Sequence, residues 1–295
     1  MAKIIDGNRL AQQIHQEIEE QVGSLRTQGV HPCLAVVLVG EDPASQVYVG
    51  RKQKACEQFG IVSRTLLHAS DFSERELLRL IADLNADSSV HGILVQLPLP
   101  GSLSSSRVIQ AISPEKDVDG FHPVNRGKLA AGEECYAPCT PAGIQEMLIR
   151  ERIDTAGKHV VIVGRSGIVG MPLAVMLSQK KPGANATVTL CHTATRDLGY
   201  HTRQAEILIV ASGRACTVTA EMVQEGCVVI DVGVNRVADP SHPKGYRLVG
   251  DVDFAAVEKK ASAISPVPGG VGPMTIAMLL KNTLQAARKQ SAAVS

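Results

Sequence analysis

A tyrosine and a lysine stand four residues apart, at Tyr48 and Lys52, in a stretch (48–59) whose charged and apolar residues recur at helical spacing. Residues four apart share one face of a helix, so the two side chains are expected on the same side. A lysine beside an aromatic ring and a flat substrate can transfer a proton near neutral pH. The same spacing also fits a solvated lysine beside a core tyrosine. Lys54 is expected to point elsewhere, into solvent.

Gln96 is the single polar residue of the otherwise apolar run 92–97. A buried amide destabilises a fold unless it is hydrogen-bonded. Gln96 is therefore expected either to orient a partner such as Lys52 or to serve the backbone. Asp117 and Asp119 follow in a short loop, where alternate residues point in different directions. One carboxylate is expected to grip the N–H groups of a ligand ring and the other to brace the loop, although turn chemistry alone explains the pair equally well.

Residues 266–275 contain three glycines and three prolines. Such a composition specifies a fixed backbone that another group approaches closely. The segment stands directly before an expected helix over 275–287. A ligand wall explains it better than a purely structural turn.

Gly164, Gly167 and Gly170 stand three apart, after the apolar run 158–163 and before a helical stretch over 171–177. Glycines let the backbone approach a pyrophosphate, and the helix N-terminus adds oriented N–H donors. A ligand-free strand-to-helix turn is the alternative. No carboxylate follows the next strand, in 190–195, where an NAD site needs one. His192 in that stretch is expected to be a satisfied polar residue. Arg165 and Ser166 suit a 2′-phosphate, so NADP is favoured over NAD.

Composition narrows the class of protein. The 295 residues correspond to two domains at roughly 100–200 residues each. Thirty basic residues balance 29 acidic ones, which argues against nucleic acid or an anionic membrane as a partner. No apolar run approaches the ~18 residues of a membrane span, and the N-terminal residues do not resemble a secretory signal. Seven cysteines without metal-ligand spacing predict reduced thiols, no metal site and a cytoplasmic location.

Strands and helices alternate along the chain, which predicts right-handed βαβ units and a mostly parallel sheet. A helix over 73–86 is expected to begin at Ser73, with Glu76 in a capping box. A domain boundary is expected near residues 140–150. The apolar runs that predict strands are 34–39, 92–97, 160–163, 187–190, 207–210, 228–232 and 263–264.

Taken together, these motifs resemble one known family, the bifunctional methylenetetrahydrofolate dehydrogenase/methenyltetrahydrofolate cyclohydrolases of one-carbon metabolism. The likeness covers nearly the whole chain, and its specificity lies in the joint order of the motifs. They occupy residues 48–56, 92–100, 116–120, 164–170, 229–236 and 266–275.

The resemblance implies an α/β fold of two α/β domains flanking a cleft, the second a Rossmann-like doubly wound parallel sheet. A folate-binding catalytic domain would comprise residues 1–143 with the C-terminal helix 275–295, and an NADP-binding domain residues 144–274. Tetrahydrofolate derivatives would bind in the cleft. The family usually forms homodimers through the cofactor domain, so a homodimer is expected.

Site roles follow from the same resemblance. Lys52 would be the catalytic lysine, Gln96 its tuning residue, Tyr48 the stacking ring and Asp119 the carboxylate that holds the pterin, with Asp117 a neighbour of undefined role. The further positions expected against the folate are Val95, Leu97, Pro268, Gly269, Gly270, Val271, Thr275 and Ile276. The expected cofactor contacts are Gly164, Arg165, Ser166, Ile168, Thr193 and Val234.

Three other functions fit parts of the sequence. A monofunctional dehydrogenase on the same fold would need an incomplete set of Tyr48, Lys52 and Gln96, and the set is complete. An NADP-dependent dehydrogenase of a small hydroxy or keto acid would need a His or Arg cluster, which is not evident. A non-enzymatic dinucleotide-binding sensor would have no reason to keep the proline- and glycine-rich segment.

Overall fold

The computed structural model describes residues 1–242 and 245–292. Contacts divide the chain into two compact units, each built on its own parallel sheet. The small-sheet unit comprises residues 13–138 and the chain from Ile276 onward. The large-sheet unit comprises Met1–Gln12 and Cys139–Thr275. The mixed α/β fold with parallel sheets confirms the predicted fold class.

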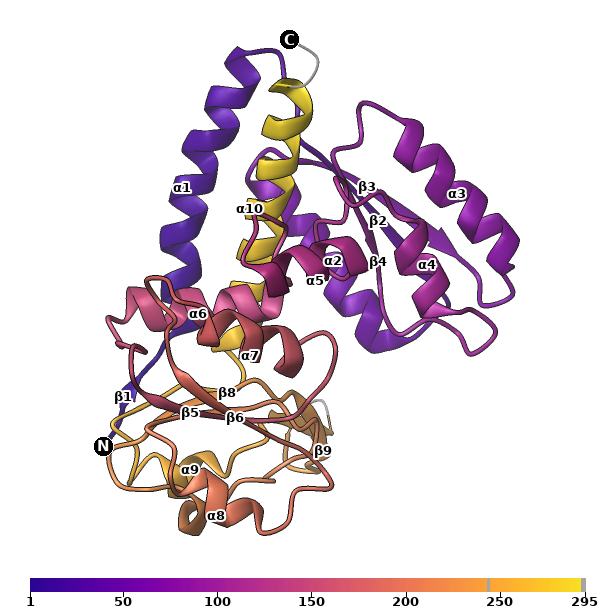
Figure 1. The fold of residues 1–295 in the computed structure, drawn as a ribbon. Helices are drawn as coiled ribbons and strands as arrows, with labels where there is room; N and C mark the ends of the chain where they lie inside the picture. The colour runs from indigo at the N-terminus through magenta and orange to yellow at the C-terminus, as the bar shows by residue number, and fades with distance from the viewer. Residues whose placement is uncertain (243–244, 293–295) are drawn as a thin grey trace. The chain divides into compact units, whose positions relative to one another are not determined.

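The small-sheet unit contains three parallel strands in the order β3-β2-β4. The central strand, β2 (Cys33–Val39), is buried along its whole length, as its uninterrupted apolar sequence predicts. In Figure 1, α3 (Glu74–Ala86) and α4 (Ser105–Ala111) cover one face, and α2 (Pro43–Gln58) lies on the other. β4 (Gly92–Val95) ends one residue before Gln96. The remaining elements of this unit are β3 (Val62–His68) and α5 (Pro123–Ala131).

Helix α3 begins where the sequence predicts. The Ser73 hydroxyl accepts a hydrogen bond from the Glu76 N–H, and the Glu76 carboxylate accepts one from the Ser73 N–H. This reciprocal cap satisfies two N–H groups that a helix start leaves without partners. The predicted capping box is therefore confirmed.

The large-sheet unit contains six parallel strands in the order β1-β11-β8-β7-β5-β6. The five predicted strands of this sheet are all present. Their observed bounds are β5 (His159–Val163), β6 (Thr187–Cys191), β7 (Ile207–Val210), β8 (Val228–Asp231) and β11 (Ala263–Ile264). The other elements are α6 (Cys139–Arg150), α7 (Gly170–Ser178), α8 (Leu198–Thr202), the 3-10 helix η1 (Ala220–Met222), α9 (Phe254–Val257) and the antiparallel hairpin of β9 (Asn235–Ala238) and β10 (Tyr246–Val249).

The N-terminal residues differ from the predicted domain division. Strand β1 (Lys3–Ile4) pairs with β11, so the first residues belong to the large sheet rather than to the unit of Lys52. The long helices α1 (Gly7–Thr27) and α10 (Val271–Ala292) each begin in the large-sheet unit and continue in the small-sheet unit.

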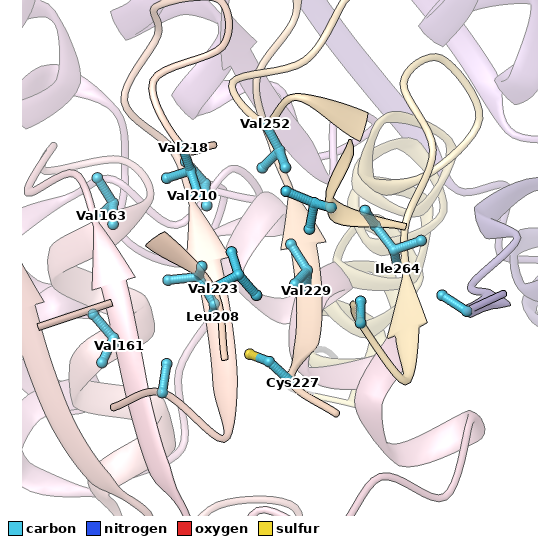
Figure 2. Close-up of a cluster of buried hydrophobic side chains, with 14 of the residues drawn as sticks. Val161, Val163, Leu208, Val210, Val218, Val223, Cys227, Val229, Val252 and Ile264 are labelled. Carbon is cyan, nitrogen blue, oxygen red and sulfur yellow. The ribbon is translucent and has the colours of Figure 1, made fainter. Parts of the chain in front are cut away.

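One face of the large sheet carries a buried apolar core (Figure 2). Alternate residues of neighbouring strands supply it, among them Val161, Leu208 and Val229, because successive strand residues point to opposite faces. Leu198 and Phe254 pack against this core from α8 and α9. The core fixes the carboxyl ends of the strands, where the candidate cofactor residues lie.

Candidate functional site

Lys52 and Gln96 meet in the small-sheet unit. Lys52 is on α2 and is 9% exposed, and its Nζ donates a hydrogen bond to Gln96 Oε1 at 3.0 Å. The Gln96 amide nitrogen donates to the Leu97 carbonyl at 2.7 Å, so the oxygen end of the amide faces the lysine. Gln96 therefore both orients Lys52 and serves the backbone, the two possibilities that its isolated polarity raised. The buried ammonium group has a fixed position next to the carboxyl end of β4.

Tyr48 lies one turn before Lys52 on α2 and is half-buried, whereas Lys54 is exposed as expected. The helix is set by Asp42, whose side chain accepts a hydrogen bond from the Ser45 N–H, and by Pro43 in its first turn. Val95 is buried at the end of β4, and Leu97 is half-buried two residues later. One helix and one strand end thus carry five of the predicted folate residues.

Asp119 lies in the loop between α4 and α5, and the bridge between Ile93 and Asp117 places this loop beside β4. The Asp119 side chain is half-buried, while Asp117 is 2% exposed. Burial raises the pKa of Asp117 to about 6, against hydrogen bonds from Asn125 and two backbone N–H groups that favour the carboxylate. The two aspartates therefore differ in environment, and Asp117 faces the protein.

The glycine turn of the large-sheet unit is built by close backbone approach. A Cβ on Gly164 would stand 2.1 Å from the Ala211 carbonyl oxygen, and one on Gly170 would stand 1.8 Å from the Gly164 carbonyl oxygen. Only glycine fits either position. The turn connects β5 directly to the first residue of α7, and the Ser166 hydroxyl accepts a hydrogen bond from the Val169 N–H. A helix N-terminus preceded by such a turn is a ready site for a phosphate.

The predicted cofactor side chains of this unit are accessible. Arg165, Ser166 and Ile168 are exposed in the turn, and Thr193 and Val234 are exposed after β6 and β8. All of them follow the carboxyl ends of parallel strands, which is where open α/β sheets bind ligands. His192 Nδ1 accepts a hydrogen bond from the Ala194 N–H at 3.2 Å, in agreement with its expected local role.

The proline- and glycine-rich segment is shorter as a loop than the sequence suggests. Helix α10 begins at Val271, so Val271, Thr275 and Ile276 lie on its first turns. Of the predicted folate positions in this segment, Pro268, Gly269 and Gly270 precede the helix. The expected helix start at residue 275 is therefore wrong by four residues. A Cβ on Gly7 would stand 1.7 Å from the Gly270 carbonyl oxygen, which explains the compact backbone. The Thr275 hydroxyl lies 3.0 Å from that of Thr140.

Two buried carboxylates of the large-sheet unit are not among the site residues predicted from the sequence. Asp231, at the end of β8, accepts hydrogen bonds from the N–H groups of Gly233, Asp251 and Val252. Asp251 accepts from the Gly213 N–H and the Asn235 amide. Together they tie three loops at one end of the sheet. Asp231 could have been noticed in the sequence, because it is a polar residue in an otherwise apolar run, as Gln96 is.

Within 1–242 and 245–292, no group of three or more His, Cys, Asp or Glu side chains could hold a metal ion. In the same residues, no helix is both long and apolar enough to cross a membrane.

Two family models match the chain. Residues 5–119 match the family model of the tetrahydrofolate dehydrogenase/cyclohydrolase catalytic domain, and residues 138–291 match that of the tetrahydrofolate dehydrogenase/cyclohydrolase NAD(P)-binding domain. The chain is 57% identical to bifunctional protein FolD 1 of Myxococcus xanthus (strain DK1622) over 293 residues, which cover 99% of this chain and 100% of that protein.

Solved structures give the same result. The bifunctional enzyme FolD (methylenetetrahydrofolate dehydrogenase/cyclohydrolase) of Campylobacter jejuni superposes with a TM-score of 0.93 at 49% identity, covering 98% of this chain and 99% of that one. The methylenetetrahydrofolate dehydrogenase-cyclohydrolase of Trypanosoma brucei, solved with NADP cofactor and an inhibitor, has a TM-score of 0.93 at 39% identity and covers 98% of each chain. The chain therefore belongs to the tetrahydrofolate dehydrogenase/cyclohydrolase family.

Proposed function

We propose that the chain is a bifunctional enzyme of one-carbon metabolism. It oxidises 5,10-methylenetetrahydrofolate to 5,10-methenyltetrahydrofolate with NADP⁺ and then hydrolyses that product to 10-formyltetrahydrofolate. The observation that carries the proposal is the contact of Lys52 Nζ with Gln96 Oε1 in a chain related over its full length to bifunctional enzymes. The three alternative functions have no comparable support.

The residues of the large-sheet unit fit NADP. The close backbone approach at Gly164 and Gly170 makes the kind of cradle that a pyrophosphate requires, and exposed Arg165 and Ser166 offer a cation and a hydroxyl to a 2′-phosphate. Thr193 and Val234 are the further proposed contacts. Bound at these residues, NADP⁺ would supply the acceptor for the hydride of the folate's methylene carbon. The protein contributes binding and orientation to this step.

Lys52 serves the second reaction. Water adds to the methenyl carbon, the bond from that carbon to N5 breaks, and the added oxygen loses both of its protons, one to N5 and one to solvent. Lys52 assists these proton transfers, and Gln96 fixes the direction of its ammonium group. Hydride transfer requires no accompanying proton transfer, so the first reaction depends less on Lys52.

The remaining small-sheet residues position the folate. Tyr48 stacks on the pterin, Asp119 accepts hydrogen bonds from the N–H groups of its ring, and Val95 and Leu97 flank Gln96 against it. In the large-sheet unit, the segment Pro268, Gly269 and Gly270 stays a predicted folate contact, as do Val271, Thr275 and, in the small-sheet unit, Ile276.

A time course of absorbance tests the two activities together. Purified protein is mixed with 5,10-methylenetetrahydrofolate and either NADP⁺ or NAD⁺, and acid-quenched samples are analysed for methenyl and formyl products. We expect reduction of NADP⁺ with little accumulation of the methenyl compound. Stoichiometric accumulation would leave only the dehydrogenase, and no reduction with either nucleotide would contradict the folate assignment.

The variant Lys52→Met tests the division of labour. Loss of a proton-transfer group lowers rates by roughly 10²- to 10⁴-fold, so cyclohydrolase activity should fall by that order while the dehydrogenase retains more. Lys54→Met, on the exposed side of the same helix, is the matched control and should keep both activities. Equal loss of both activities in Lys52→Met, with folate binding intact, would refute the acid/base role.

We propose a homodimer formed through the large-sheet unit, as the family resemblance suggests, with β6 available at one edge of the six-stranded sheet. Light scattering after gel filtration measures the mass directly.

A cytosolic location fits the seven free thiols, since disulfides are rare in reducing compartments.

A further inference from the structure

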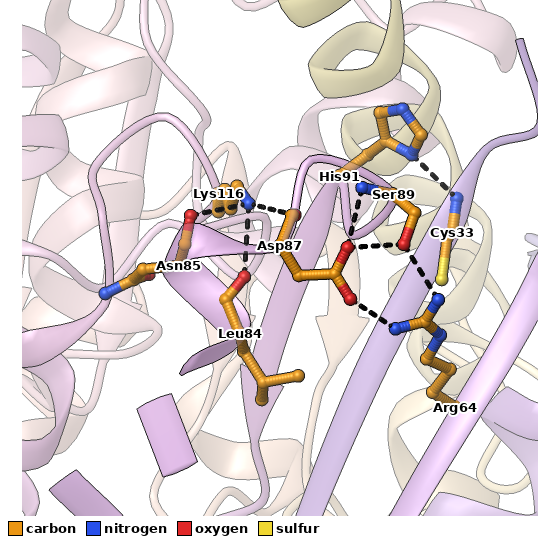
Figure 3. Close-up of polar contacts among 8 residues, drawn as sticks. All are labelled: Cys33, Arg64, Leu84, Asn85, Asp87, Ser89, His91 and Lys116. Carbon is orange, nitrogen blue, oxygen red and sulfur yellow. Dashed lines mark hydrogen bonds and ion pairs between the residues drawn. The ribbon is translucent and has the colours of Figure 1, made fainter. Parts of the chain in front are cut away.

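The segment that presents Asp119 is anchored at its start by a buried lysine. Lys116 Nζ donates to the carbonyl oxygens of Leu84, Asn85 and Asp87 at 3.1, 2.8 and 2.7 Å (Figure 3). These are carbonyls at the end of α3, which lack partners within the helix. The Lys116 carbonyl in turn accepts a hydrogen bond from the Ile93 N–H of β4. The residue before Asp117 is therefore fixed to both a helix and a strand.

Asp117 anchors the segment on the far side of Asp119. Its carboxylate accepts hydrogen bonds from the N–H groups of Phe121 at 3.2 Å and His122 at 2.8 Å. The amide of Asn125 donates to the same carboxylate at 2.8 Å. Since Asp117 is 2% exposed, these bonds form away from solvent. One side chain thus connects the residues on either side of Asp119.

Helix α10 supplies a third anchor. The Asn282 side-chain amide donates to the carbonyl oxygens of Val118 at 2.8 Å and Ala137 at 3.0 Å. Asn282 is 9% exposed and is the residue on this helix that bonds to the backbone directly before Asp119. The backbone on both sides of Asp119 is held, while Asp119 itself is half-buried.

A loop held in this way does not have to be ordered by its ligand. Fixing the backbone of a mobile residue costs conformational entropy, and a loop that is already fixed binds more tightly by avoiding that cost. We propose that Asp117 and Asn282 are positioning residues, which hold the Asp119 carboxylate in the orientation that binds the pterin ring of the folate. The inference rests on the proposed function and deepens it, because it assigns residues to folate affinity rather than to the chemical step.

Steady-state kinetics of the full chain test the proposal. The variants are Asp117→Asn, which removes acceptor capacity at nearly constant volume, and Asn282→Ala, which removes both donor bonds from a helix. Each should raise the KM for 5,10-methylenetetrahydrofolate about tenfold to a hundredfold, as expected for one or two lost hydrogen bonds. The KM for NADP⁺ should stay within about twofold and kcat should change less than the folate KM.

Thr283→Val provides the matched control. Thr283 is the next residue of α10, is fully buried and donates its hydroxyl hydrogen bond to Leu279 within the helix. Its loss should lower the melting temperature to a similar extent and leave the folate KM unchanged. This separates general destabilisation from a defect at the Asp119 loop.

The outcomes are distinguishable. If the wild-type chain does not oxidise the folate, the proposed function fails before the variants are compared. If the wild type is active and both variants keep its folate KM, or if Thr283→Val raises that KM equally, the positioning role is refuted. If Asp117→Asn does not fold, Asn282→Ala decides the question by the same measurement.

Discussion

The two candidate sites of this chain are constructed in opposite ways. In the large-sheet unit the glycine turn is made of backbone, and it requires the absence of side chains at Gly164 and Gly170. In the small-sheet unit the proposed reactive group is a long side chain, Lys52, held by another side chain, Gln96. The first kind of site is broken by adding atoms and the second by removing them. The two units should therefore respond differently to small substitutions.

Gly170→Ala should have the largest effect. Its methyl group would overlap the Gly164 carbonyl oxygen, and backbone atoms cannot relax as a flexible side chain does. We expect a loss of at least about 3 kcal/mol in the free energy of unfolding and roughly a hundredfold loss of NADP⁺ affinity. Denaturant titration and calorimetric titration with NADP⁺ measure the two quantities. Unchanged NADP⁺ affinity would show that the backbone turn is not the cofactor site.

The buried aspartates give a second comparison between the units. Burial raises the pKa of both Asp117 and Asp231 to about 6, and the neighbouring charges of Asp119 and Asp251 act in the same direction. The folded state then holds protons that the unfolded chain releases between pH about 4 and about 6. The free energy of unfolding should therefore fall as the pH rises through that window, by at most about 3 kcal/mol for each carboxyl.

Denaturant titrations at several pH values between 4 and 7 measure this slope. Asp117→Asn and Asp231→Asn should each reduce this dependence of the free energy of unfolding on pH. The difference between wild type and variant cancels the contributions of the carboxyls that both proteins contain. A wild-type slope that survives in both variants would show that these two groups titrate normally.

Removing the amide of Gln96 should have a smaller, selective effect. In Gln96→Ala the Lys52 ammonium loses its bond to Oε1, and the loss of one hydrogen bond to a charged group amounts to about 1.5–3 kcal/mol. Cyclohydrolase activity should fall about ten- to a hundredfold, with a smaller loss of dehydrogenase activity. Separate assays with methenyl- and methylenetetrahydrofolate measure the ratio. An unchanged ratio would contradict a role for Gln96 in the second reaction.

The smallest expected change is a gain. Gly23 lies within α1, and a Cβ there would meet no atom within 4 Å. Gly23→Ala should raise the free energy of unfolding by about 0.5–1 kcal/mol, because glycine loses more backbone freedom in a helix. Unchanged activities in this variant would confirm that an added methyl group is harmful only where the backbone is closely packed. A loss of stability would contradict that account.

The sequence predicted those strands whose apolar residues run without interruption, such as β2 and β7. It did not predict β3, because Ser63 and Arg64 interrupt its apolar residues and its side chains are exposed or half-buried. The hairpin of β9 and β10 was also missed, since its strands have four residues each and mostly exposed or half-buried side chains. A strand that is buried on both faces has an uninterrupted apolar sequence, which can be recognised. A strand with exposed side chains does not require such a sequence.

The candidate sites were predictable to a similar degree. Gln96 stood out because a polar residue in an otherwise apolar run needs a partner, and the structure places it directly after β4 with Lys52 beside it. Asn282 did not stand out, because a helix tolerates polar residues and its partner Val118 lies 164 positions away in the chain. Asp231 and Asp251 are also not neighbours in the sequence, being 20 positions apart. Local composition reveals that a polar group needs a partner but does not identify a distant one.

The pairing of β1 with β11 joins residues that are far apart in the sequence, since Lys3 lies opposite Ala263. The six-stranded sheet therefore cannot be completed during synthesis until nearly the whole chain has left the ribosome. A recombinant fragment of residues 139–275 alone would lack β1 and expose the edge of β11, where Ile264 loses its bond from the Ile5 N–H. Unpaired edges of this kind template association between chains. Attempts to produce residues 139–275 of the large-sheet unit separately should therefore yield an aggregating fragment unless the first twelve residues are fused to it.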